Sequence, residues 1–275
     1  MNKLTFLFTS RQLKYLSLFI IILFIQSFSF GQSPYKLNLT TEGIIFGSGL
    51  IIAGIAFPTN DDIHPLTVSE ISELRREGIN KFDRGATYNW LPSAGRASNV
   101  LLVTSLLSPG LLAISSEIRS DFTPVLTMYL ETLMFSEALP FLLKGLTRRI
   151  RPFAYNGDAP LEVKQTKGVK RSYFSGHATA AFAMAVFVST VYSDYYPNSG
   201  WKPFVWAGSL ALAATVGVLR YSAGLHFPTD IITGALVGSA VGYLIPFVHR
   251  VENENLNIST GFNSSGSFIM VNYKF

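Results

Sequence analysis

The chain lacks cysteine and has few charged residues, and both shortages restrict the class of protein to which it can belong. Without a cysteine among its 275 residues it forms no disulfide framework, thiolate metal site or cysteine-linked lipid anchor. Charged residues make up 14% of the sequence, against about 25% in ordinary soluble domains. Hydrophobic residues make up 48% and recur in long stretches. This composition predicts a protein that faces lipid.

The first 31 residues have the pattern of a targeting segment. Three basic residues precede an apolar run from Tyr15 to Phe30, and Ser29 and Gly31 supply the small residues of a cleavage site. This is the pattern of a secretory signal peptide, and the alternative is an uncleaved signal anchor. In either case we do not expect this segment to form part of the folded core.

Five membrane-length helices are predicted after this segment, with one shorter candidate ahead of them. The shorter candidate, residues 43–57, falls below the roughly 20 apolar residues that a span needs. The five longer ones cover residues 100–116, 123–146, 175–192, 203–219 and 229–248. The fold expected is therefore all-α, a multi-pass transmembrane helical bundle of five or six spans.

Basic residues gather where the second long helix ends. Lys144 and Arg151 are seven residues apart, so on a continuing helix they share one face, and Pro152 then ends the run. Two aligned cations at a membrane surface suit an anion such as phosphate. For Arg148 and Arg149 we expect the ordinary role of basic residues that flank a span.

The next helix begins with Ser175, Gly176 and His177. Unpaired backbone N–H groups at a helix start favour an anion, and Gly176 allows close approach of the backbone. His177 lies in the first turn of a membrane helix, where an imidazole without a partner is costly. A packing role for this histidine is the competing interpretation.

A third cluster joins the last two helices and contains Arg220, His226 and Asp230. Asp230 follows His226 by four residues, so its carboxylate can accept the proton of one ring nitrogen and leave the other as a nucleophile. Counting spans brings all three clusters to one face of the membrane. The sequence thus predicts a single site built from three separated segments.

The pattern Lys-x6-Arg-Pro, Ser-Gly-His and Arg-x5-His-x3-Asp resembles the type 2 phosphatidic acid phosphatase (PAP2) superfamily. The resemblance covers roughly residues 123–246. Phe174 stands where the family usually has a proline, and Leu219 where it usually has a serine. The resemblance implies a membrane phosphatase of a lipid-type phosphate monoester or pyrophosphate, working through a phosphohistidine without a metal or other cofactor.

The same resemblance implies a role for each motif residue. His226 would be the nucleophile, oriented by Asp230, and His177 the general acid and base. The phosphate would be held by five residues, Lys144, Arg151, Ser175, Gly176 and Arg220.

Two other functions share these features. A vanadate-dependent haloperoxidase would reuse the same oxyanion pocket, and a non-catalytic membrane protein could bind lipid headgroups through the cations alone. The second alternative leaves the pairing of His226 with Asp230 without a purpose.

The expected organisation has four parts. Residues 1–31 form the targeting segment, 32–98 an N-terminal segment with the doubtful span, 99–250 the PAP2-type core, and 251–275 a tail of β-like composition. The expected partners are the bilayer and a lipid phosphate or isoprenyl pyrophosphate, with no nucleic acid. We expect a bacterial inner membrane and an extracytoplasmic site.

Overall fold

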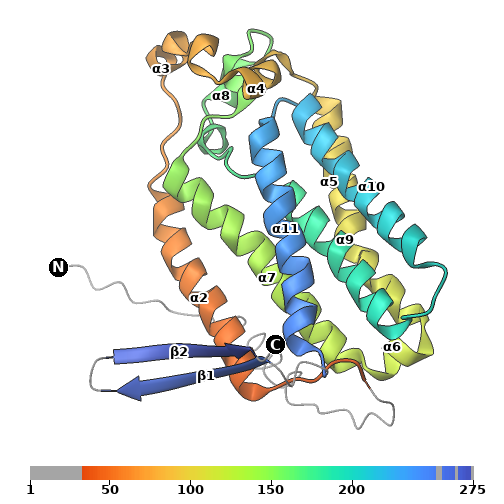
Figure 1. Cartoon of the computed structure of the whole chain (residues 1–275). Helices are drawn as coiled ribbons and strands as arrows, with labels where there is room; N and C mark the ends of the chain where they lie inside the picture. Colours follow the sequence, from red (N-terminus) through yellow and green to blue (C-terminus); the bar gives the residue numbers. More distant parts are fainter. Residues whose placement is uncertain (1–32, 252–255, 264–265, 274–275) are drawn as a thin grey trace, which may run out of the picture.

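A computed structural model describes residues 33–251, 256–263 and 266–273, and is dominated by six long helices (Figure 1). These are α2 (Leu39–Asp61), α5 (Pro92–Leu107), α7 (Phe122–Thr147), α9 (Gly176–Tyr195), α10 (Lys202–Ser222) and α11 (Pro228–His249). The 3-10 helix η3 (Ser108–Ile114) extends α5. The predicted targeting segment lies outside the described residues.

Short helices cover one end of this bundle, the upper end in Figure 1, and together they form the cap. They are α3 (Val68–Glu73), η1 (Arg76–Gly78), α4 (Lys81–Arg84), η2 (Gly85–Tyr88), η4 (Pro152–Tyr155), α8 (Leu161–Lys164) and η5 (Lys167–Lys170). Helix α6 (Ser116–Ser120) lies at the other end. An antiparallel hairpin of β1 (Leu256–Asn263) and β2 (Gly266–Tyr273) follows the bundle, so the all-α prediction holds for everything but the tail.

Helix α9 forms the centre of the bundle. It packs against α5, α7, α10 and α11, and most of its residues are buried. Five of the other helical segments are long and apolar enough to cross a membrane. Their outer faces expose large apolar side chains such as Leu50, Val103 and Leu236, which in water would form an unfavourable surface. The chain is therefore an integral membrane protein, as predicted.

Helix α2 is longer than the sequence suggested. It runs for 23 residues, because Asn38 caps its start and the helix continues through Pro58 to Asp61. The apolar pattern had ended at Phe57, where proline and polar residues begin. A helix of 23 residues is about 35 Å long, which is enough for a full span.

Glycines allow α11 to approach α9 closely. Gly234, Gly238 and Gly242 recur every fourth residue on one face of α11 and are buried. A Cβ at Gly238 would overlap the carbonyl oxygen of Thr179. Small residues at this spacing let membrane helices pack backbone to backbone. The contact matters for the site because α9 and α11 both begin there.

Replacing Gly238 should separate the two helices. We expect Gly238→Leu to lower the free energy of unfolding by about 1–3 kcal/mol, the usual cost of overpacking. The matched control is Gly208→Leu on α10, where a Cβ meets nothing within 4 Å. Thermal unfolding in detergent compares the two variants, and equal midpoints would contradict the packing argument.

Candidate active site

The three sequence clusters lie where the long helices reach the capped end of the bundle, the upper end in Figure 1. Helices α7 and α10 end there, and α9 and α11 begin there. The eight predicted residues lie in the last turns of α7 and α10, the first turns of α9 and α11, and the segments that adjoin them: Lys144, Arg151, Ser175, Gly176, His177, Arg220, His226 and Asp230. The structure thus brings the three segments together, while their chemical roles stay predictions.

His226 is almost completely buried, with 1% of its surface exposed. Its Nδ1 lies 2.8 Å from the carbonyl oxygen of Ser172, which only accepts, so Nδ1 carries the hydrogen. Nε2 is then left with its lone pair. Burial holds the pKa of His226 well below its ordinary value. The ring is therefore neutral, as a nitrogen nucleophile must be.

Asp230 differs in detail from the expected partner of His226. Its Oδ2 lies 3.6 Å from His226 Nδ1, beyond a normal hydrogen bond, because the Ser172 carbonyl is closer. The same oxygen accepts hydrogen bonds from the Ser172 hydroxyl at 2.5 Å and from the backbone N–H of Phe227 at 2.9 Å. Asp230 therefore fixes the segments on both sides of the imidazole and adds a negative charge beside it.

Arg149 was expected to flank the membrane span, and the structure shows a different role. Its guanidinium donates to Asp230 Oδ1 at 2.5 Å and to Asp83 Oδ2 at 2.8 Å, and it lies over the Phe227 ring. Arg148 lies outside this network and forms an exposed ion pair with Asp62. Arg149 joins two buried carboxylates that would otherwise repel each other.

Asp83 is the second carboxylate of this network and is fully buried. It accepts hydrogen bonds from the backbone N–H and the hydroxyl of Thr229, from Asn80 and from Arg149. Burial by itself would raise the pKa of Asp83, but these hydrogen bonds outweigh it and hold the pKa below the ordinary value. Asp83 therefore stays ionised and ties the cap to the start of α11.

His177 and Arg220 share one partner, Asn99 of α5. The Asn99 Oδ1 lies 2.8 Å from His177 Nε2 and 3.3 Å from Arg220 NH1. Arg220 also donates to the Ser98 hydroxyl at 3.3 Å, while its Nε has no hydrogen-bond partner. The two α5 residues thus orient the arginine from across the bundle, although Leu219 beside it has no side-chain donor or acceptor.

The other phosphate-binding candidates surround the start of α9. A Cβ at Gly176 would lie 3.0 Å from Lys144 Nζ, so the absence of a side chain makes room for the ammonium group. The Ser175 hydroxyl caps α9 by accepting from Ala178 N–H, and its own proton remains available to donate. The guanidinium of Arg151 makes only long hydrogen bonds within the described residues, 3.4 Å to the carbonyl of Arg171. Lys144, Arg151 and Arg220 all lie within electrostatic range of His177.

Four supporting residues had not been predicted: Asp83, Asn99, Arg149 and Ser172. Asn99 and Asp83 are far from the motifs in sequence, and only the packing of α5 and the cap brings them near. Arg149 and Ser172 lie within a few residues of the motifs. For Arg149 and Ser172 there was one indication in the sequence of a role in the site, namely a polar residue just outside a motif in an apolar chain.

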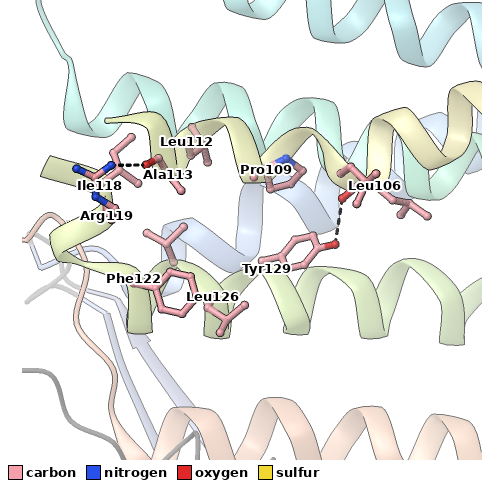
Figure 2. Close-up of a pocket in the computed structure, with 12 residues that line it drawn as sticks. Leu106, Pro109, Leu112, Ala113, Ile118, Arg119, Phe122, Leu126 and Tyr129 are labelled. Carbon is pink, nitrogen blue, oxygen red and sulfur yellow. Dashed lines mark hydrogen bonds between the residues drawn. The ribbon is translucent and has the colours of Figure 1, made fainter. Parts of the chain in front are cut away.

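Two cavities differ in their relation to this site. The first, about 230 Å³, lies between η3 and the start of α7 and is lined mainly by apolar residues such as Leu112, Phe122 and Tyr129 (Figure 2). Its lining residues on α7 run from Phe122 to Tyr129, about 22–33 Å along the helix from Lys144. The second, about 900 Å³, lies between α2 and α7 and reaches Lys167 and Arg171 beside the site.

The part of the chain that contains the candidate site resembles a known protein family. Residues 125–254 match the family model of the PAP2 superfamily. Every predicted site residue lies within this range. This part of the chain, a little under half of its length, is similar to the PAP2 superfamily.

Two known proteins are similar to this chain. The chain is 34% identical over 85 residues to a lipid A 4'-phosphatase of Porphyromonas gingivalis, and the match covers 31% of each chain. The chain thus matches about a third of the length of that relative. A solved transmembrane PAP2 type phosphatidylglycerolphosphate phosphatase from Bacillus subtilis is 20% identical, with a TM-score of 0.47, covering 76% of this chain and 96% of the other.

The Arg149 network gives a test of how the site is positioned. Arg149→Ala should lower kcat by about 10- to 100-fold, because Asp230 and the Phe227–Thr229 turn lose their shared donor and the imidazole moves. Arg148→Ala is the matched control and should leave kcat unchanged, because its ion pair with Asp62 is exposed. The rate of phosphate release is measured for both purified variants. Equal rates would show that Arg149 does not position the site.

Proposed function

We propose that the protein is a membrane phosphatase that hydrolyses a phosphate monoester or pyrophosphate of a lipid-type substrate. The observation that carries the proposal is the meeting of a buried neutral histidine, a second histidine and three cations where two helices begin. Helix starts and fixed cations stabilise phosphate oxygens, and in phosphoryl transfer such positioning supplies most of the catalysis. Headgroup binding alone needs no buried imidazole with a free nitrogen.

His226 Nε2 would attack the phosphorus, forming an N–P bond as the bond to the leaving oxygen breaks. His177 would give a proton to that oxygen and later take one from the water that hydrolyses the phosphohistidine. As Asn99 Oδ1 only accepts, His177 Nε2 carries a hydrogen and Nδ1 is the nitrogen that exchanges the proton.

The phosphate oxygens would be bound by fixed positive groups. Lys144, Arg151 and Arg220 supply charge, while the Ser175 hydroxyl and the Gly176 N–H donate hydrogen bonds. Three cations do here what Mg²⁺ does in other phosphoryl-transfer sites, so the proposed reaction needs no metal.

The cavity between α2 and α7 supports a lipid-type substrate. Its walls are apolar along Leu50, Phe57 and Phe141, and Lys167 and Arg171 lie at its polar end. Arg171 donates to the Asn60 carbonyl at 3.1 Å, and its own carbonyl faces Arg151. An acyl or isoprenyl chain in this groove would place its phosphate near Arg151, with the tail directed toward the bilayer.

Replacing the nucleophile gives the decisive test of the reaction. His226→Ala should lower kcat by about 10⁴-fold or more, and His177→Ala by about 10²–10⁴-fold, on phosphatidate or isoprenyl pyrophosphate. His64→Ala is the control, because His64 is exposed and outside the site. A His226→Ala protein that keeps EDTA-resistant phosphatase activity would overturn the proposal. Bromide oxidation with added vanadate would instead indicate the haloperoxidase chemistry.

The length of α2 links the side of the membrane to the fate of the N-terminal segment. We propose that the site faces the extracytoplasmic side, as expected for the superfamily. Because α2 is long enough to span fully, its start at Leu39 then lies in the cytoplasm. A cleaved or anchoring N-terminal signal would translocate that start. The signal segment and the extracytoplasmic site therefore exclude each other.

Cysteine labelling decides between them, since the chain has no native cysteine. Lys81→Cys places a thiol on the exposed cap, and Ser120→Cys places one on the opposite end of the bundle. A membrane-impermeant maleimide applied to intact spheroplasts should label Lys81→Cys and spare Ser120→Cys. The reverse pattern would assign the site to the cytoplasm and support the signal segment.

A further inference from the structure

Three ionisable residues meet inside the bundle, far from the candidate active site. Glu42 comes from the first turn of α2, Glu131 from α7 and His249 from the end of α11. One ligand atom of each lies within 4.8 Å of the other two. His249 is 19 residues along α11 from Asp230, which corresponds to about 28 Å. The cluster is therefore separate from the phosphate site.

His249 directs its Nε2 atom toward the two carboxylates. Its Nδ1 lies 2.7 Å from the Ile245 carbonyl oxygen, which only accepts, so Nδ1 carries the hydrogen. Its Nε2 lies 3.1 Å from Glu42 Oε1 and 3.5 Å from Glu131 Oε2. A backbone carbonyl that fixes the tautomer in this way is the usual partner of a metal-binding histidine.

Among the described residues, the basic group that faces the two carboxylates is His249, which is positive only when it is protonated. Glu131 is fully buried, and neither of its oxygens has a hydrogen-bond partner. Glu42 Oε2 is also buried without one. In the described part of the chain no lysine or arginine pairs with either group, and the ion pairs recorded for them lead only to His249. Two such charges are costly in an apolar interior unless a cation joins them.

The spacing fits one particular class of cation. Zn²⁺ binds imidazole nitrogen and carboxylate oxygen at about 2.0–2.2 Å in a tetrahedral arrangement, which sets neighbouring ligand atoms about 3.3–3.5 Å apart. The separations of the two carboxylate oxygens from His249 Nε2, 3.1 and 3.5 Å, lie close to that value. One histidine and two carboxylates also suit the ligand preferences of Zn²⁺ and balance its charge.

We propose that Glu42, Glu131 and His249 form a buried Zn²⁺ site that joins α2 and α11 to α7. Helix α2 packs mainly against α7, so it has few other contacts to hold it. The metal would stabilise the fold by binding the native state, while the reaction at the other end of the bundle proceeds without it.

The test uses the full chain, purified through a tag that does not bind metal and treated with a chelator. On titration with Zn²⁺, the wild-type protein should take up about one ion per chain and its unfolding midpoint should rise. Zinc content is measured by mass spectrometry after gel filtration. A wild-type protein that takes up no zinc and shows no change in its unfolding midpoint would overturn the proposal and indicate a cluster that shares protons instead.

Two pairs of variants assign the ion to this cluster. Glu131→Gln and His249→Ala should each lower the bound zinc at least tenfold under the same conditions. Glu137→Gln, on the same helix, and His64→Ala, on an exposed segment, are the matched controls and should keep it. Zinc retained by both cluster variants would place the ion elsewhere and contradict the proposal. If a variant fails to fold, the wild-type titration remains decisive.

Discussion

The site depends on one buried carboxylate, Asp230. Its two oxygens accept hydrogen bonds from Arg149, the Ser172 hydroxyl and the Phe227 backbone N–H. These donors come from the end of α7, the segment before α9 and the turn before α11. A buried charge is stable only when its surroundings supply such donors, so the three segments must be in place together. The imidazole of His226 takes its position and its tautomer from the same arrangement.

The cap extends this constraint outward. Asp83 accepts hydrogen bonds from Arg149 and Thr229, and it thereby connects the short helices to the start of α11. Asn99 connects α5 to His177 and Arg220 in the same way. Polar side chains in an apolar bundle are expensive, and Asp83 and Asn99 each align groups that approach from different segments. The supporting residues therefore define the geometry of the site as much as the motif residues do.

The sequence predicted the helices and the convergence of the motifs well, because long apolar runs and alternating crossing of the membrane leave little freedom. It placed the end of α2 too early, since Pro58 and the polar residues after it remove the apolar pattern without ending the helix. It also missed Asp83 and Asn99, whose roles arise from tertiary packing between distant segments. Arg149 was misjudged because a basic residue at the end of a span has the same appearance whether it faces lipid headgroups or a buried carboxylate.

The peripheral position of α2 separates two tasks within one chain. The segment from α5 to α11 carries the histidines, the cations and most of their supports, while α2 supplies one wall of the groove that would admit the substrate. Changes along the groove-facing side of α2 can therefore alter which lipid enters while the phosphate-binding groups stay as they are. In evolutionary terms, substrate choice in this architecture can diverge at a single outer helix, with the reaction machinery inherited intact.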